Sequence, residues 1–283
     1  MSGQTALRRI PALLLGATLP LALAAGRGVA DSPGEAAADS AALGKVMAEA
    51  RRTLSAARRP GPLRAGEDLT FHVRFGMIHA GEAHLQIVGV EKVGQASCYR
   101  LRSLARSSGV FGRIYGIDDR VESLMDSSGL MSHRIEKHLR EGSYRQEQTV
   151  HFDYAGMHAR YANGDTLSIP GPVQDDLSAF YVARCLDLHE NQVYYLETHS
   201  NKVNYPMQVR VYGKEKLRTD AGEFECFKVE PRVDRGGIFK HRGGMLIWMT
   251  TDARHLPVRL KSKLPVGSII ADLASVRTGG TAP

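Results

Sequence analysis

Residues 66–75 read GEDLTFHVRF, and this stretch decides the fold class. From Leu69 to Phe75, large apolar residues alternate with polar ones. Such alternation is typical of a β-strand with one face in an apolar core and the other face in solvent. The same pattern returns over residues 83–87, after the turn-forming Gly81, so the sequence predicts a β-hairpin at the start of a domain.

Further runs of this kind follow, separated by short turn-forming sequences. They lie near 99–103, 118–126, 130–140, 143–154, 157–162, 192–203, 207–219, 223–233, 244–251, 256–264 and 268–276. Short loops force neighbouring strands to pair antiparallel, because a parallel crossover needs about a dozen residues or more. The chain is therefore predicted to be mainly β, a long antiparallel meander of about thirteen strands that curls into a half-barrel or open barrel.

One strong helical pattern interrupts the strands at residues 174–188 (QDDLSAFYVARCLDL). Asp175 is a suitable N-cap, and Asp176 lies favourably in the first turn. We expect the helix, about 175–188, to cover the apolar face of the curled sheet. Arg184 lies close to the apolar stripe of this helix and needs a polar partner. Asp175, Asp176 or an acid on the sheet can supply it, and these helix residues are predicted to brace the helix.

The first thirty residues have the layout of a secretory signal peptide. Two arginines precede an apolar run over residues 10–25, and small residues follow it. We expect cleavage after Ala24 or Ala30; the alternative is an uncleaved anchor, for which the apolar run is short. No cysteine precedes Cys98, so no lipid attachment at a cleavage-site cysteine is expected. The predicted location is the periplasm.

The rest of the chain divides by composition. Residues 31–62 are expected to hold a small polar linker and an amphipathic helix outside the barrel, 63–276 a single β-rich domain, and 277–283 a disordered tail. The amphipathic pattern, at 43–58, has a basic face. Such a helix either makes a peripheral contact with a membrane or packs on the main domain.

Composition and charge exclude several classes of protein. The chain has 283 residues, 43% hydrophobic and 24% charged, which is typical of a globular protein and not of a disordered one. The net charge is +7, but residues 1–30 contain three arginines and no acid. Without them 34 basic and 30 acidic residues remain, a net charge of +4. With the expected export, this modest charge predicts no nucleic-acid partner.

No sequence motif indicates a metal site. The eleven histidines include no HExxH motif and no pair at helical i, i+4 spacing, and the chain has no CxxC. His72, His79 and His84 fall on the first hairpin, where histidines on the wet face are expected to be surface residues. We expect no metal and no cofactor.

No sequence motif indicates catalytic or redox chemistry either. Asp175, Asp176 and Glu122 are the candidates for an acid pair of the kind that glycosidases use, but capping and ion pairing explain the two aspartates, so no catalytic residue is assigned. The three cysteines, Cys98, Cys185 and Cys226, lie on separate elements. Buried free thiols are expected, with one disulfide as the alternative.

Several stretches resemble a bacterial envelope family known as domain of unknown function 3108. They are Gly66-Glu67, Gly81-Glu82, YGIDDRVE (115–122), DDLSAFYVAR (175–184), Gly222-Glu223-Phe224 and LIWMTTDARHLPVRLKSKLPVGSIIADL (246–273). The resemblance covers about residues 63–276 and brings no catalytic residues with it. The last stretch is also similar to the lipoprotein-carrier (LolA/LolB-like) superfamily. That similarity implies a half-open barrel, covered by helices, which holds lipid chains in an apolar concavity.

These observations predict an exported, non-enzymatic binding or carrier protein of the cell envelope, with an apolar groove for a lipid or lipidated partner. Burying each methylene of an acyl chain contributes about 0.8 kcal/mol without any directional contact. The alternatives are an envelope scaffold or assembly factor that binds another envelope protein, and an enzyme acting on polysaccharide or lipid. In a closed sandwich the same residues would be core. The groove candidates are Phe71, Phe75, Leu85, Ile87, Phe180, Tyr181, Val209, Val211, Ile247 and Met249.

Overall fold

The computed structural model describes residues 33–57, 61–233, 244–264 and 267–280, with side chains from residue 44 onward. The predicted signal peptide lies outside the described residues. So do the glycine-rich stretch around residues 236–243, where a hairpin bend is expected, and the last three residues of the chain.

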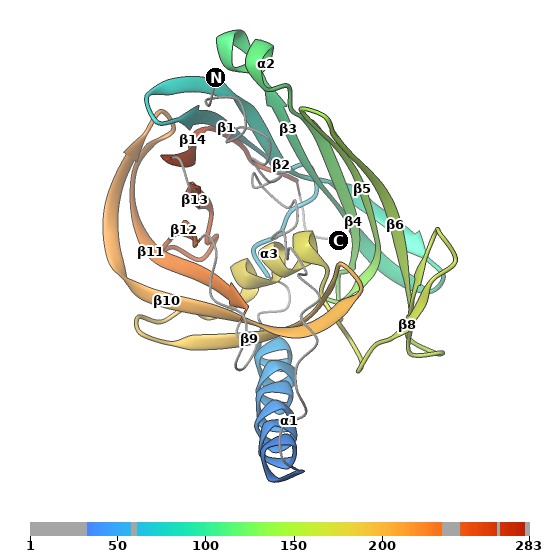
Figure 1. Cartoon of the computed structure of the whole chain (residues 1–283). Coiled ribbons are helices and arrows are strands. Elements are labelled where there is room, and N and C mark those ends of the chain that lie inside the picture. The colour runs from blue at the N-terminus through green and yellow to red at the C-terminus, as the bar shows by residue number, and fades with distance from the viewer. Residues whose placement is uncertain (1–32, 58–60, 234–243, 265–266, 281–283) are drawn as a thin grey trace.

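In this part of the chain, fourteen strands form one antiparallel sheet (Figure 1), which confirms the predicted fold class. The strands are β1 (Asp68–Phe75), β2 (Ile78–Val93), β3 (Ala96–Ser107), β4 (Asp118–Asp126), β5 (Ser132–Glu141), β6 (Tyr144–Asp153), β7 (His158–Tyr161), β8 (Thr166–Ser168), β9 (Val193–Ser200), β10 (Val203–Thr219), β11 (Gly222–Val233), β12 (Met245–Thr250), β13 (Pro257–Leu264) and β14 (Gly267–Arg277).

The first and last strands pair in the middle of the sheet. On one side of this pair the order runs from β1 to β8, and on the other side it runs from β14 back to β9. In the β1–β14 register, Phe71 lies opposite Leu273 and Val73 lies opposite Ala271. Two meanders are therefore joined at their ends, and β8 and β9 remain as the two edges.

The sheet curls so that the two edge regions approach each other (Figure 1). Side chains span the gap: the Tyr161 hydroxyl and His199 Nε2 are 2.8 Å apart, and Asn204 Nδ2 donates to the Ser168 carbonyl at 2.7 Å. The backbone of Gln174 adds two hydrogen bonds to β9. No backbone hydrogen bonds join the edge strands β8 and β9 directly, so the sheet itself does not close into a barrel. Side chains and the segment that precedes α3 close the gap.

Three helices occur in the described residues: α1 (Pro33–Ala56), α2 (Gly109–Ile114) and α3 (Asp176–Cys185). In Figure 1, α3 lies inside the ring of strands and α1 projects outside it. The structure corrects the predicted helix bounds. Helix α1 begins ten residues before the predicted start at Leu43, with a proline in its first turn, where proline is tolerated. Helix α3 ends at Cys185 instead of Leu188, and α2 was not predicted. None of the described helices is both long and apolar enough to cross a bilayer.

Helix α1 packs against the outer edge of β9. Ala50, Thr53 and Ala57 are buried there, and the Tyr195 N–H donates to Thr53 Oγ1 at 3.5 Å. An uncovered strand edge is a template for unwanted pairing. The structure therefore places part of the apolar face of the 43–58 segment on the main domain, as the packing interpretation expects.

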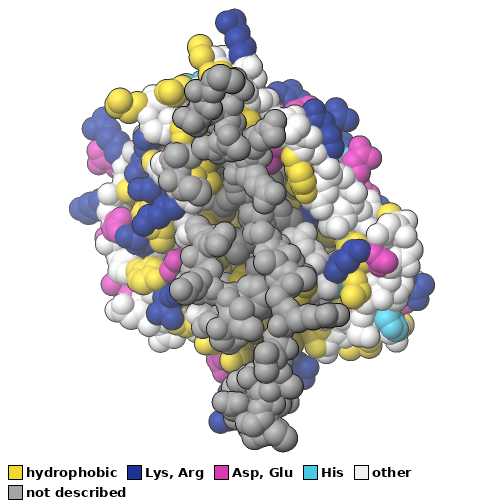
Figure 2. Space-filling model, in the orientation of Figure 1, with side chains coloured by type: hydrophobic (Ala, Val, Ile, Leu, Met, Phe, Trp, Pro, Cys, Tyr) yellow, Lys and Arg dark blue, Asp and Glu magenta, His cyan; other side chains and the backbone are white. Residues whose placement is uncertain are grey.

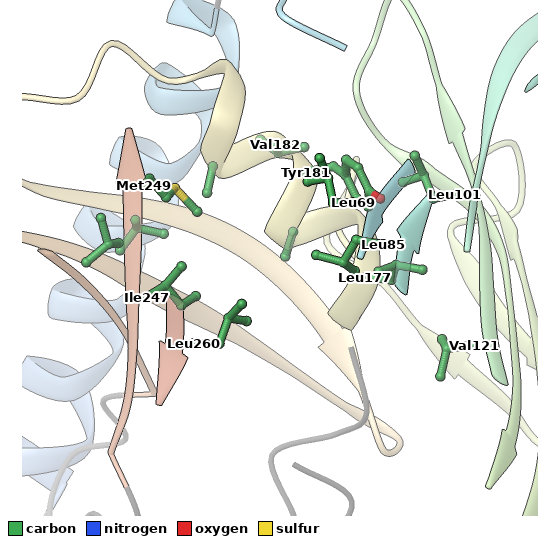
Figure 3. Packing of buried hydrophobic residues seen from close by; sticks show 14 of the residues in the cluster. Leu69, Leu85, Leu101, Val121, Leu177, Tyr181, Val182, Ile247, Met249 and Leu260 are labelled. Carbon is green, nitrogen blue, oxygen red and sulfur yellow. The ribbon is translucent and has the colours of Figure 1, made fainter. Parts of the chain in front are cut away.

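The core lies between the curled sheet and α3. Figure 3 shows Leu69, Leu85 and Leu101 on one side of the helix and Ile247, Met249 and Leu260 on the other. On β1, Leu69, Phe71 and Val73 are buried while the residues between them are exposed or half-buried, as the alternation predicts (burial pattern along the strand).

The first part of the predicted disordered tail is ordered. Arg277 belongs to β14, and the N–H of Gly280 donates to the Ala65 carbonyl at 2.8 Å. A Cβ atom on Gly279 would lie 2.3 Å from the Ala65 oxygen, so only glycine allows this close approach. Residues 277–280 therefore contact the β-rich domain.

The three cysteines are free and buried, as expected. Burial raises the pKa of Cys98 to about 11 and that of Cys226 to about 12, because desolvation disfavours the thiolate. We expect no modification of the native protein by a thiol reagent at neutral pH, and modification of all three cysteines in denaturant. Counting modified sites by mass spectrometry measures this. Rapid labelling of a native cysteine would show that its surroundings open to water.

Candidate functional site

The predicted groove residues come together in one apolar cluster inside the barrel. They come from β1, β2, α3, β10 and β12, which are far apart in the chain. Eight of them are at most 4% exposed: Phe71, Leu85, Ile87, Tyr181, Val209, Val211, Ile247 and Met249. Phe75 and Phe180 are only half-buried. The interior wall is thus apolar, and its coverage is incomplete at these two rings.

Two further inward residues share this incomplete coverage. Met207 lies on the same strand face as Val209, and Met245 lies on the same face as Ile247, because each precedes its neighbour by two positions. Both methionines are half-buried and pack on the core cluster. Neither methionine is among the predicted groove residues, although period-two alternation extends to both. Methionine adapts well to ligands of irregular shape.

The N-terminus of α3 is fixed by the predicted cap. Asp175 is fully buried, and its side chain accepts hydrogen bonds from the N–H groups of Leu177 and Ser178 at 2.8 Å. Ser123 Oγ donates to the same carboxylate at 2.6 Å, and Ser132 Oγ also donates to it. Burial raises the pKa of Asp175, and the serine hydroxyls act against this shift. The cap thus ties α3 to β4 and β5.

Asp176 has a partner that the sequence analysis did not name. Its carboxylate forms an ion pair with Lys137, which is 1% exposed, and accepts from Ser200 Oγ at 2.8 Å. Lys137 lies between Ile135 and Leu139 on the inward face of β5, so alternation already indicates an inward lysine. A buried lysine needs an acid, and Asp176 supplies it.

The C-terminal end of α3 is held by a two-fold hydrogen-bonded ion pair. Arg184 Nη1 lies 2.6 Å from Glu67 Oε1, and Nη2 lies 2.9 Å from Oε2. The two residues are 1% and 7% exposed. Glu67 directly precedes β1, so Arg184 pairs with an acid next to the sheet and with neither Asp175 nor Asp176. The Tyr181 hydroxyl adds a bond to the Gln86 carbonyl at 3.1 Å.

The acid pair considered for an enzyme is not assembled. Glu122 accepts from Arg100 Nη2 at 2.7 Å and Arg102 Nε at 2.8 Å, whereas the next residue, Ser123, contacts Asp175 in the interior. Neighbouring residues on a strand point to opposite faces, so Glu122 faces away from Asp175. Burial acts to raise the pKa of Glu122, but the hydrogen bonds from the two arginines lower it overall.

A different pair of acids lies buried at the adjoining ends of β4 and β5. Asp119 is 6% and Glu141 3% exposed, and their side chains are hydrogen-bonded to each other. Asp119 Oδ1 also accepts from the Arg140 N–H at 2.8 Å. Burial, followed by the charge of Asp119, raises the pKa of Glu141 to about 9. The pair therefore holds a proton at neutral pH.

The histidines of the first hairpin have local partners. His72 Nδ1 lies 2.9 Å from Asp220 Oδ2, its ring contacts that of His79, and His84 Nδ1 lies 3.3 Å from Asp68 Oδ1. Within the described ranges, no group of three or more His, Cys, Asp and Glu side chains is placed to hold a metal ion.

Some hollows bounded by described residues lie away from the groove candidates. One of about 380 Å³ is lined by Pro62, Arg64, Arg254 and Thr278, among others. Another of about 190 Å³ lies between α1 and β9, at Leu54 and Leu196. Neither is lined by a groove candidate.

Comparison with solved structures shows a β-barrel-like fold similar to that of another bacterial protein. The chain is similar to a β-barrel-like protein of domain of unknown function DUF1849 from Brucella abortus, with a TM-score of 0.52, 8% identity, and coverage of 76% of this chain and 98% of that chain. An exported-type protein with a YmcC-like fold from Bacteroides fragilis has a TM-score of 0.36 at 10% identity, covering 77% and 98%. A protein assigned as a lipoprotein from Parabacteroides distasonis has a TM-score of 0.35 at 12% identity, covering 77% and 97%.

Comparison by sequence gives the family. No curated protein matches the chain. A family model described as protein of unknown function (DUF3108) matches residues 70–274, from the first strand to the last. The barrel that carries the braced helix and the apolar interior is thus the matched region, and the chain belongs to the DUF3108 family.

Proposed function

We propose that this protein is a non-enzymatic binding or carrier protein of the cell envelope, and that its barrel takes up the acyl chain of a lipid or of a lipidated partner. The observation that carries the proposal is a set of apolar side chains that are only half-buried: Phe75, Met207 and Met245 on the wall and Phe180 on α3. All four pack on the buried apolar cluster of the interior, so they form an apolar lining that is only partly covered. An acyl chain along it would gain about 0.8 kcal/mol for each methylene removed from water.

The polar bracing of α3 supports the same proposal. Charged contacts to Lys137 and Glu67 hold the helix at its two ends, in addition to the packing of its buried apolar side chains. We expect a helix held in this way to keep its place whether or not a ligand contacts Phe180. The similarity of residues 246–273 to the lipoprotein-carrier superfamily, and the expected signal peptide, point in the same direction.

Native mass spectrometry of the protein purified from an envelope extract tests the proposal. We expect a population that carries the added mass of a lipid, which is released by organic extraction and identified by its fragments. A protein that carries no lipid, and that binds no acyl-chain probe after extraction, contradicts the proposal.

Adjacent residues on β12 supply a matched pair of variants. Met245 faces the interior, whereas Leu246 lies on the other face of the strand, and both are half-buried. We expect Met245→Glu to weaken binding of N-phenyl-1-naphthylamine by about tenfold or more, because a carboxylate in the groove must be desolvated. Leu246→Glu is expected to retain binding. Fluorescence titration measures both.

Phe180→Glu provides an independent check from the helix side of the groove, with the same expected loss. Equal affinities for Met245→Glu and Leu246→Glu would contradict an interior binding site. A loss of binding by Met245→Glu, Leu246→Glu and Phe180→Glu that only follows their loss of helicity, measured by circular dichroism, would also contradict an interior site.

A further inference from the structure

Four exposed aliphatic side chains stand together at one end of the molecule. Met77 lies in the turn between β1 and β2, Ile78 is the first residue of β2, and Val110 and Ile114 lie on α2; we call these four residues the tip patch. Met77 is fully exposed, and the others are 56%, 66% and 70% exposed, respectively. Figure 2 shows hydrophobic side chains projecting at this end, with basic side chains beside them.

The two halves of the tip patch are held side by side. The Ser108 N–H donates to the Ala80 carbonyl at 2.9 Å, which ties the start of α2 to β2. Phe111 is buried and its ring lies 6.1 Å from that of Phe75. Val110 and Ile114 are four residues apart and so share one helix face, while Phe111 anchors α2 to the hairpin. The short helix thus presents aliphatic residues to solvent.

The shape of the patch favours a fluid apolar partner. Exposed aliphatic residues that gather in one place mark interaction sites, whereas single ones need no explanation. Here they project from a tight turn and a short helix, which are convex features. Side chains that protrude in this way insert between lipid headgroups, while a strand or helix of a protein partner needs a groove or an open edge.

Two basic residues lie near the tip patch. Arg113 is exposed on α2, between Val110 and Ile114. Lys263 is exposed on β13 and pairs in register with Ser268, whose carbonyl accepts from the Gly76 N–H at 3.3 Å. Both cations therefore lie close to the aliphatic residues, where they complement a negatively charged surface. Arg106 contributes little, because Asp118 lies 3.1 Å from it.

We propose that the tip patch docks the protein on an anionic phospholipid membrane. The aliphatic side chains enter the boundary between headgroups and acyl chains, and Arg113 and Lys263 contact lipid phosphates. The surface is separate from the barrel interior, so the proposal does not depend on what the barrel binds. Helix α1 lies at the opposite end of the molecule (Figure 1), so a membrane contact through residues 43–58 would require the reverse orientation.

Flotation with lipid vesicles tests the proposal. We expect the purified protein to float with vesicles of phosphatidylethanolamine and phosphatidylglycerol, and to bind vesicles of phosphatidylcholine alone far less. The double variant Met77→Ser with Ile114→Ser should lower the partition coefficient by about tenfold, because two aliphatic groups no longer leave water. Arg113→Glu should lower it as well, and added salt should weaken binding of the unchanged protein.

The matched control is Val88→Ser with Val90→Ser. These two valines are 41% and 39% exposed on the far part of β2, and the control should bind as the unchanged protein does. A Met77→Trp variant gives a second readout, since an inserted tryptophan shifts its fluorescence to shorter wavelength when vesicles are added.

Three outcomes would overturn the proposal. The first is an unchanged protein that does not bind anionic vesicles, and the second is a control that loses as much binding as the tip variant. The third is a Met77→Trp emission that stays constant with vesicles but shifts with protein concentration, which would assign the patch to contact with a second copy. The Met77→Trp readout also decides the question if the double variant does not fold.

Discussion

Replacing Arg184 by methionine is expected to lower the free energy of unfolding by about 3–5 kcal/mol. The substitution leaves the carboxylate of Glu67 in the interior without its cation, since the two side chains are almost fully buried and bonded at 2.6 and 2.9 Å. An isolated buried charge is far more costly than a buried ion pair. Denaturant unfolding followed by circular dichroism measures the change.

Two further variants distinguish the loss of the Arg184–Glu67 ion pair from the effect of removing any arginine. Arg254→Met removes a half-exposed arginine that pairs with Asp252, and should change the free energy of unfolding by about 1 kcal/mol or less. Combining Arg184→Met with Glu67→Gln removes both charges and should recover part of the loss. An Arg184→Met protein as stable as Arg254→Met would mean that water reaches Glu67.

Raising the pH from about 5 to about 9 is expected to destabilise the protein through Asp119 and Glu141. In the folded state Glu141 keeps its proton to about pH 9, whereas an unfolded glutamate loses it near pH 4.3. The contribution of this proton to the free energy of unfolding is fully present below the pKa of the glutamate in the unfolded state. It is lost as the pH rises through the pKa of Glu141 in the folded state. The contribution is at most about 1.4 kcal/mol per pH unit for one proton.

Glu141→Gln removes this dependence, because glutamine stays neutral and still donates a hydrogen bond to Asp119. We expect the variant to be more stable than the unchanged protein at pH 9 and to show a flatter profile of unfolding free energy against pH. Glu147→Gln, on the exposed part of β6, is the control and should leave the profile unchanged. Parallel profiles for all three proteins would show that the pair does not share a proton.

Alternation alone predicts the architecture, because most strands have one face in the core. It locates β1 and the strands of the second meander to within a few residues, and it places Val209 and Ile247 on the interior side. It marks only the middle of β2 (Ile78–Val93), through the pattern at 83–87. It fails for α2, whose sequence GVFGRI contains two glycines and is too short for a helical period. It also misses the first turns of α1, since the residues there are small and polar with no apolar stripe.

The sequence does not identify the partners of the buried charged residues, for a different reason. The need of Arg184 for an acid follows from its place near the apolar stripe of α3, but the choice of Glu67 depends on how the sheet curls around the helix. Lys137 and Asp176 meet for the same reason. The proton-sharing of Asp119 and Glu141 arises because β4 and β5 bring the two carboxyl groups to one inward face. Local sequence determines that these groups are buried, and the tertiary fold determines which partner each one meets.

The pairing of β1 with β14 determines the order in which the chain can assemble. Phe71 and Leu273 are about 200 residues apart, so the centre of the sheet is complete only after nearly the whole polypeptide has emerged. Each meander can form its own hairpins early, but β1 keeps one unpaired edge until β14 arrives, and such edges favour aggregation. Contacts of this separation also slow folding. We therefore expect the pairing of β1 with β14 to be a late step of folding, before which the centre of the sheet is unprotected.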